Sequence, residues 1–377
     1  MLIRSLISPG PNIPRHYKDV GRPVCYEIQI AADATFTSMV DEDRVYLNRY
    51  VHDRPLAQGR YYWRVRAVPC GQAPAAWSET RTFTIAPCDE IITIQVPSDA
   101  QDYADAIQQA VARMATLAEQ GKSIKLVFPP GDYHIRESMR GPLIELNDVT
   151  DIVIDGTGAR LHLTSRKQGL IHASHCENIT VMGFSTSYRK GALRIQGYVK
   201  AVDQEEQTVT VSIEPGFPDF SASDNPDSDI FYLLEPDTEG RLKTGIPNFF
   251  RVKDDFSRNA DNTWTFSLNR PVEAWDVGDR YCFNFRGGST QFVDFSESRS
   301  VTAYGLTTGG WGGMQFVAIE GSQFNILHCR TTFDEGKWMT GNADGVHIRG
   351  HEVGPWIEGL QIQAIGDDSV ALYARPA

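Results

Sequence analysis

A repeated unit of two short strands constrains this chain more than any other feature of its sequence. Four segments, LIELNDVTDIVI, LIHASHCENITV, QFVDFSESRSVTA and QFVAIEGSQFNIL, align without internal gaps. In each segment one hydrophobic residue lies eight positions before another: Ile144 and Ile152, Ile171 and Ile179, Val293 and Val301, Phe316 and Phe324. Two of the steps between units are 27 and 23 residues long. Such periods are typical of a solenoid in which each coil stacks on the next.

The remaining step, from Ile171 to Val293, is 122 residues long and far exceeds one coil. The excess, residues 188–286, carries alternating strand patterns such as VKAVDQEEQTVTVSIE and TWTFSLN. We therefore predict that this segment is inserted between two coils and forms a small β-barrel of its own.

Between Val24 and Ile85 the sequence shows the period-two alternation of β-strands, as in Tyr26, Ile28 and Ile30 or in YYWRVRA. Several short strands separated by turn residues predict a small β-sandwich. The segments YEIQIAADATF, GRYYWRVRAV and AWSETRTFTI resemble fibronectin type III domains found beside bacterial carbohydrate-active enzymes. The resemblance implies a spacer or a docking module.

Residues 98–121 give the one strong helical signal. An apolar stripe at helical spacing runs through Ile107, Ala110, Val111, Met114, Leu117 and Ala118. Ser98, Asp99 and Asp102 are candidate N-caps, and Gly121 is a fitting C-terminal stop. This helix followed by LVFPPGDYHI resembles the entry to right-handed parallel β-helices of the pectate lyase type, where a helix covers the open end of the first coil.

We accordingly expect an all-β fold, a right-handed parallel β-helix with an inserted β-barrel and an N-terminal fibronectin type III-like sandwich. The expected division is a sandwich over residues 1–88, a capping helix and first coils over 89–187, the barrel over 188–286, and further coils over 287–377. The last strand, SVALYA, is followed by three residues and no cap, which predicts a fragment of a longer enzyme that lacks several coils.

Three carboxylates converge in two late segments, GNADGVHIRG and IQAIGDDSVALYA. Pairing Val346 with Val370 as inward positions places Asp344 level with Asp368, and Asp367 one place earlier. Adjacent strands lie about 4.8 Å apart. Carboxyl groups this close cannot all ionise easily, and one protonated group beside ionised ones gives the acid and the base that glycoside hydrolysis needs. The alternative is turn chemistry, because Asp-Gly pairs are common at solenoid corners.

NADG followed by GDD resembles the polygalacturonase signature, NTDG then GDD, with Ala343 departing from threonine. The phrase GYVKAVDQEEQTVTVSIEPGFP within an insertion resembles the α-1,3-galactosidase family on the same fold. These resemblances imply an inverting hydrolase of galactose- or galacturonate-type linkages. They also imply Asp367 as the general acid, with Asp344 and Asp368 activating the water.

Four further residues are expected on the outer face beside the carboxylates, where they either bind sugar or are solvated: Gln315, His347, Arg349 and Tyr373. Two other functions stay open on the same solenoid. One is a polysaccharide lyase with an Arg or Lys base and calcium, and the other is a non-catalytic glycan-binding protein.

The charge balance of 36 basic and 48 acidic residues, net −12, argues against a nucleic-acid partner. No apolar stretch approaches the ~20 residues of a membrane span. The six cysteines lack zinc-site spacing, so we expect no metal and no cofactor. We expect a monomer that acts on carbohydrate and is secreted or periplasmic, although Met1–Pro14 lacks the apolar core of a signal peptide.

Overall fold

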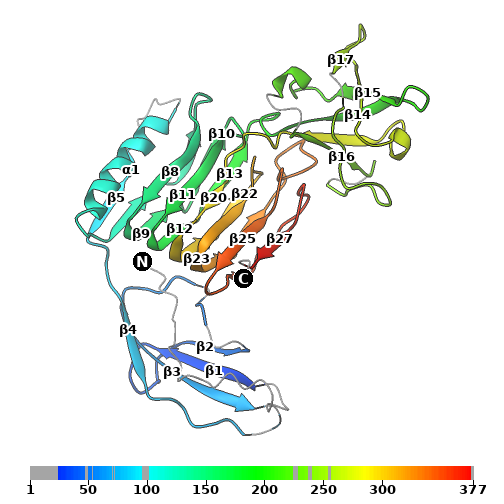
Figure 1. Cartoon of the computed structure of the whole chain (residues 1–377). Coiled ribbons are helices and arrows are strands. Elements are labelled where there is room, and N and C mark those ends of the chain that lie inside the picture. Colours follow the sequence, from blue (N-terminus) through cyan, green and yellow to red (C-terminus); the bar gives the residue numbers. More distant parts are fainter. Residues whose placement is uncertain are drawn as a thin grey trace.

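The computed structural model describes residues 24–46, 50–52, 54–69, 71, 73–95, 102–223, 228–236, 240–253 and 256–374. Most of the described chain winds into a parallel β-solenoid of the right-handed type, and its strands stack side by side in Figure 1. Three rows of parallel strands form the faces of this solenoid.

The first face consists of β8 (Gly141–Asn147), β11 (Gln168–Ser174), β20 (Val293–Asp294), the start of β23 (Phe316–Leu327), β25 (Val346–His351) and β27 (Val370–Tyr373). The second consists of β5 (Glu90–Thr93), β6 (Ile124–Val127), β9 (Thr150–Asp155), β12 (Glu177–Met182), β21 (Ser298–Tyr304), the end of β23 and β26 (Trp356–Glu358). The third consists of β7 (Gly131–His134), β10 (Ala159–Leu163), β13 (Ser185–Tyr188), β22 (Thr307–Thr308) and β24 (Arg330–Thr331).

The register of these strands follows the sequence repeat. Ile171 pairs with Ile144 on one side and with Val293 on the other, and Val293 pairs in turn with Phe316. All eight hydrophobic residues that define the repeat are completely buried. Burial of one such side chain stabilises a fold by about 1.5–3 kcal/mol, so these rows hold consecutive coils in register. The prediction of stacked coils is confirmed.

Four turns between the first and second faces each use two residues in the left-handed backbone region. The first of the two has φ near 54°: Asp148 (54°), His175 (54°), Glu297 (52°) and Glu320 (55°). The second residue lies three positions later and has a φ of similar size: Asp151 (59°), Asn178 (58°), Ser300 (53°) and Gln323 (61°). This conformation costs a non-glycine residue about 1–2 kcal/mol. The buried rows on both sides of the turn therefore impose it, and they fix the eight-residue interval.

Helix α1 (Ala104–Ala118) covers one end of the stack, as predicted (Figure 1). Its buried side chains belong to the solenoid core: Ala104, Ile107, Ala110, Val111 and Met114. The Asp102 carboxylate accepts the Ala104 amide at 3.1 Å, and Gly121 follows the helix with φ 74°. The candidate caps Ser98 and Asp99 lie outside the described residues.

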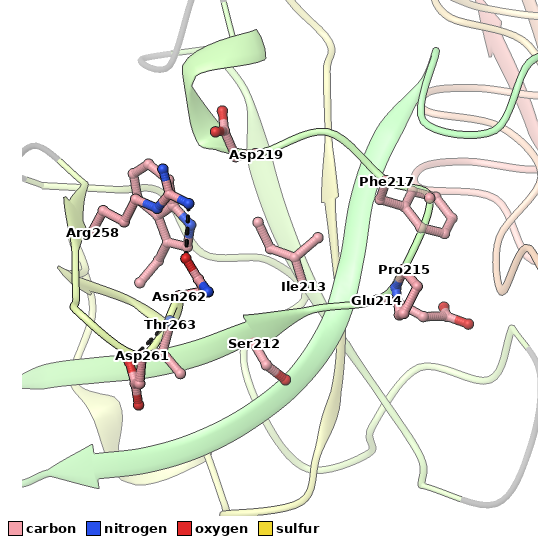
Figure 2. A pocket seen from close by; sticks show the side chains of 12 residues that line it. Ser212, Ile213, Glu214, Pro215, Phe217, Asp219, Arg258, Asp261, Asn262 and Thr263 are labelled. Carbon is pink, nitrogen blue, oxygen red and sulfur yellow. Dashed lines mark hydrogen bonds between the residues drawn. The ribbon is translucent and has the colours of Figure 1, made fainter.

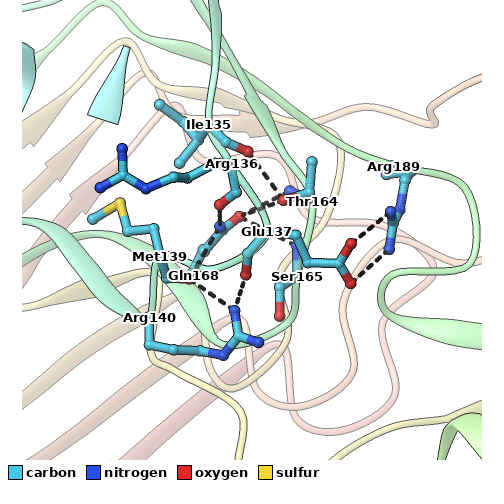
Figure 3. A network of polar contacts seen from close by, with 9 residues as sticks. All are labelled: Ile135, Arg136, Glu137, Met139, Arg140, Thr164, Ser165, Gln168 and Arg189. Carbon is cyan, nitrogen blue, oxygen red and sulfur yellow. Dashed lines mark hydrogen bonds and ion pairs between the residues drawn. The ribbon is translucent and has the colours of Figure 1, made fainter. Parts of the chain in front are cut away.

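A buried glutamine ties neighbouring coils together where the chain enters the first face (Figure 3). The Gln168 amide group donates to the carbonyl oxygens of Arg136 and Met139 at 2.7 and 3.2 Å. Its oxygen accepts the backbone amides of Thr164 and Ser165 at 2.8 and 3.2 Å. Gln168 is completely buried, and these four bonds satisfy the polar groups that burial would otherwise leave unpaired.

A six-stranded antiparallel sheet interrupts the solenoid between β13 and β20. Its strands follow the spatial order β16 (Ile230–Leu234), β19 (Arg280–Asn284), β14 (Arg194–Asp203), β15 (Thr208–Ile213), β18 (Trp264–Ser267) and β17 (Ser257–Arg258). Two short 3₁₀ turns, Phe220–Ala222 and Val272–Ala274, accompany it. The sheet has a separate aromatic core that includes Phe220, Phe231, Phe266, Trp275 and Phe283. The structure places these strands between β13 and β20, and the inserted barrel stays a prediction.

The described N-terminal residues form one antiparallel sheet in the order β2 (Met39–Val45), β1 (Val24–Ala31), β3 (Gly59–Pro69) and β4 (Arg81–Ile85). The predicted alternation holds, because Ile28, Ile30 and Trp63 are buried on one face. The second sheet that a sandwich requires is not among the described residues, and the fibronectin-like sandwich stays a prediction.

Candidate active site

Strands β25 and β27 bring the three predicted aspartates to the beginning of the first face. Val346 pairs with Val370 and Ile348 with Leu372, the register that the sequence predicts. The Gly345 amide donates to the Asp368 carbonyl oxygen at 2.9 Å and so joins the two segments just before the strands begin. Asp344 and Asp368 therefore lie on neighbouring coils, with Asp367 directly beside Asp368.

Asp344 is held by a histidine of β25, the strand that begins two residues after it. Its Oδ2 lies 2.7 Å from Nδ1 of His347, and only 8% of its side chain is exposed. The His347 ring lies on the outer face and contacts the Tyr373 ring of the next coil, with centroids 5.1 Å apart. The sequence placed His347 near the carboxylates as a sugar ligand, and the structure gives it a direct bond to one of them.

Asp367 is held by an arginine that the sequence analysis did not select. Its Oδ2 lies 2.8 Å from the Arg286 guanidinium, while its Oδ1 accepts the Asp368 amide at 3.1 Å. Arg286 follows the last strand of the inserted sheet and is 81 positions away from Asp367 in the sequence. A local sequence pattern carries no signal for a contact over that distance.

The asparagine of the NADG motif links the aspartate loop to the base of the inserted sheet. The completely buried Asn342 donates from its Nδ2 to the Leu193 and Phe285 carbonyl oxygens at 2.8 and 3.0 Å. Leu193 precedes the first strand of the inserted sheet and Phe285 follows its last strand. Asn342 therefore connects both ends of the insertion to the loop that carries Asp344.

A buried arginine of the inserted sheet supports the same loop. Arg194 donates to the carbonyl oxygens of Met339 and Thr340, the latter at 2.6 Å, and to Asn342 Oδ1 at 3.0 Å. Burial lowers the pKa of Arg194 to about 10. The adjacent Trp338 and Met339 side chains form a small core with one face of the inserted sheet: Ile230, Tyr232, Leu234 and Cys282. The inserted sheet thus both packs against the loop before Asp344 and hydrogen-bonds to it.

The structure corrects the prediction for Gln315. Instead of lining the outer face, Gln315 is completely buried, and its Nε2 donates to the Thr308 hydroxyl at 2.7 Å. The equivalent positions of earlier coils, Leu143, Leu170 and Phe292, are also completely buried. The chain bends at this position as it enters the first face, so two consecutive side chains point inward and the alternation begins one residue later.

Arg349 and Tyr373 lie on the outer face, where the sequence placed them. They pair with one another across β25 and β27, and both are exposed. Within the described residues neither forms a hydrogen bond or ion pair with one of the three aspartates. A role in sugar binding therefore stays a prediction for both.

A groove of about 380 Å³ lies on the inserted sheet and shares no lining residue with the aspartate cluster. In Figure 2, Arg258 faces Asn262 on one side of the groove, and Phe217 lies on the other. Several polar side chains of this groove bond to nearby residues of their own loops: Arg258 donates to Asn262 at 2.8 Å and Thr263 donates to Asp261 at 2.6 Å. These side chains therefore stabilise the conformation of the loops that border the groove, and the groove is not assigned a ligand.

Among the residues that the structure describes, no group of three or more His, Cys, Asp or Glu side chains is arranged to hold a metal ion. None of the helices in this part of the chain has the length and apolar character needed to cross a membrane.

No protein-family model and no curated protein matches this chain. Among solved structures, it is similar to a family 28 exopolygalacturonase of Yersinia enterocolitica, with 12% identity over 93% of this chain and 67% of the other and a TM-score of 0.39. A tailspike of Acinetobacter baumannii bacteriophage AP22 in complex with capsular saccharide has 12% identity, coverage of 73% and 44%, and a TM-score of 0.19. Pectate lyase Pel3 of Pectobacterium carotovorum has 9% identity, coverage of 94% and 93%, and a TM-score of 0.18.

Proposed function

We propose that this chain hydrolyses glycosidic bonds of a polysaccharide or oligosaccharide with galactose- or galacturonate-type units, by direct attack of water with inversion. One observation carries the proposal: Asp344, Asp367 and Asp368 lie at the start of adjacent parallel strands, on loops held by buried contacts. Hydrolysis with inversion needs one carboxyl to protonate the leaving oxygen and another to activate water. The register of β25 and β27 brings carboxyl groups for both roles together from neighbouring coils.

The structural surroundings support chemistry at these aspartates over turn formation alone. A turn aspartate needs hydrogen bonds only within its own loop. In contrast, Asp344 bonds a histidine of the outer face, and Asp367 forms an ion pair with Arg286 of the insertion. Placing three carboxylates together costs electrostatic energy. Stacked turns have no need of that arrangement, but a hydrolase does.

The inserted sheet and the N-terminal sheet are consistent with an enzyme that acts on its substrate outside the cytoplasm. We propose that residues 188–286 form an inserted module and that the N-terminal sheet belongs to a fibronectin type III-like spacer of a secreted or periplasmic monomer. The segment resemblance and the antiparallel order β2-β1-β3-β4 support the spacer.

Product analysis tests the proposed function. The full chain is incubated separately with polygalacturonic acid, its trisaccharide and an α-1,3-linked galactose disaccharide, with calcium and with a chelator. We expect new reducing ends from one of them, without ultraviolet absorbance of an unsaturated product and without calcium dependence. Proton NMR should show the released anomer inverted. A calcium-dependent unsaturated product would establish a lyase, and binding without cleavage would establish a non-catalytic protein; either result contradicts the proposal.

A further inference from the structure

Both carboxylate oxygens of Asp367 accept hydrogen bonds, and one of the donors comes from the inserted sheet. Oδ2 accepts from Arg286 at 2.8 Å and Oδ1 accepts from the Asp368 backbone amide at 3.1 Å. An ionised carboxylate only accepts, whereas a protonated carboxyl group must donate from one oxygen. The contacts of Asp367 are therefore those of a hydrogen-bond acceptor.

Buried groups fix the backbone next to Arg286. The Asp229 carboxylate accepts the Gly287 amide at 3.0 Å and the Ser223 hydroxyl at 2.7 Å. Arg166 Nε donates to the Gly287 carbonyl oxygen at 3.3 Å. Asp229 is completely buried, and this desolvation raises its pKa. A carboxyl group is retained in such a place only with partners that satisfy it, and these partners hold the chain from which the Arg286 side chain extends.

The inserted sheet also holds the residue before Asp367. The Tyr232 hydroxyl on β16 donates to the Gly366 carbonyl oxygen. A Cβ atom on Gly366 would lie 2.9 Å from that hydroxyl oxygen and 2.8 Å from the Asn342 carbonyl oxygen, so glycine permits this close approach. The backbone and the carboxylate of this short segment are thus both fixed from the inserted sheet.

We propose that Arg286 is a positioning residue that keeps Asp367 in the acceptor geometry of the water-activating base. The proton donor is then Asp344 or Asp368, which reverses the role that the polygalacturonase resemblance implies for Asp367. The Arg286 and Asp367 side chains are 26% and 39% exposed. An ion pair this accessible adds little to the stability of the fold, so its main effect is to orient the Asp367 carboxylate. This inference rests on the proposed hydrolytic function.

The test compares Arg286→Ala and Arg286→Lys with Arg299→Ala in the full chain. Arg299 forms a comparable pair with Glu352 at 3.0 Å, with side chains 60% and 58% exposed, away from the aspartates. We expect Arg286→Ala to lower kcat by roughly 10- to 100-fold with KM changed less than about twofold. Arg286→Lys should retain part of the activity, and added guanidinium, but not urea, should restore part of the Arg286→Ala activity. Arg299→Ala should behave as wild type.

Leaving groups distinguish a base from an acid. On phenyl and 2,4-dinitrophenyl glycosides of the sugar that wild type releases, Arg286→Ala should lose the same factor with both, because a good leaving group removes the need for an acid and not for a base. A loss confined to the phenyl glycoside would make Asp367 the acid and overturn the proposal. So would wild-type kcat in Arg286→Ala, or a rise in KM alone.

A structural measurement separates this inference from the proposed function. Crystal structures of wild type and Arg286→Ala should show the Asp367 carboxylate displaced in the variant, with the Asp344–His347 contact intact. If wild type cleaves no glycoside, the proposed function fails, and this comparison still decides whether Arg286 positions Asp367. An unmoved Asp367 would reject the positioning role even in an active enzyme.

Discussion

The residues of the two aspartate segments divide into those that carry charge and those that allow close packing. Gly341 lies against the completely buried Trp311 ring: a Cβ atom there would lie 2.1 to 2.6 Å from three ring atoms. Asn342 uses its amide to bond the two ends of the insertion. Beside the catalytic candidates, these segments thus contain a glycine that close packing requires and an asparagine that hydrogen-bonds to the insertion.

Replacement of Gly341 by alanine should destabilise the fold. The added methyl group must displace the Trp311 ring, and overpacking of this kind costs about 1–3 kcal/mol. Gly354→Ala is the matched control, because no atom lies within 4 Å of a Cβ at that position, and its effect should stay within about 0.5 kcal/mol. Thermal unfolding measures both variants, and equal midpoints would contradict the packing role of Gly341.

At the scale of elements, the parallel register places polar side chains of successive strands in contact along the outer face. His172 on β11 pairs with Asp294 on β20, and their side chains meet at 3.3 Å. The hydrogen bond that the His172 ring donates to Asp294 raises the pKa of His172, burial lowers it, and the charges of Asp294 and Glu145 raise it further. The net result is a raised pKa, so this contact couples two coils through the protonated ring.

The stability from this contact should depend on pH. Because the pKa of His172 is raised in the folded state, its contribution is complete below the unfolded value of about 6.5 and disappears as the pH rises through the folded value. The difference in unfolding free energy between wild type and His172→Gln should be largest at pH 5 and smaller at pH 8. Urea unfolding of both proteins measures it. The Asp294→Asn background should weaken the pH dependence, because only the charge of Glu145 then raises the pKa of His172; an undiminished pH dependence there would contradict this assignment.

The sequence predicted the solenoid elements because the same hydrophobic positions must be buried in every coil. That requirement fixed the eight-residue interval, the pairing of Val346 with Val370, and the amphipathic helix at the end of the stack. It failed at Gln315, where a bend turns two consecutive side chains inward. It also missed Arg286, because hydrophobic periodicity contains no information about how an inserted sheet folds back onto a coil 81 positions away.

At the scale of the whole molecule, the inserted sheet and the solenoid share the structure around the aspartates. Trp338 and Met339 pack on the inserted sheet, and Arg194 bonds the same loop. Arg286 reaches the neighbouring segment from the opposite end of the insertion. The solenoid thus sets the register of the carboxylates, and contacts from the insertion support the two loops that carry them.

The most direct test of the central claim is the activity of Asp344→Asn, Asp367→Asn and Asp368→Asn on the glycan that wild type cleaves. Each substitution keeps the shape of the side chain and removes its acid–base function, so each should lower kcat by about 10²–10⁴-fold without a shift in the thermal midpoint. Asp132→Asn, on the third face beside His162, is the control and should keep wild-type activity. Undiminished release of reducing sugar by all three variants would contradict the account.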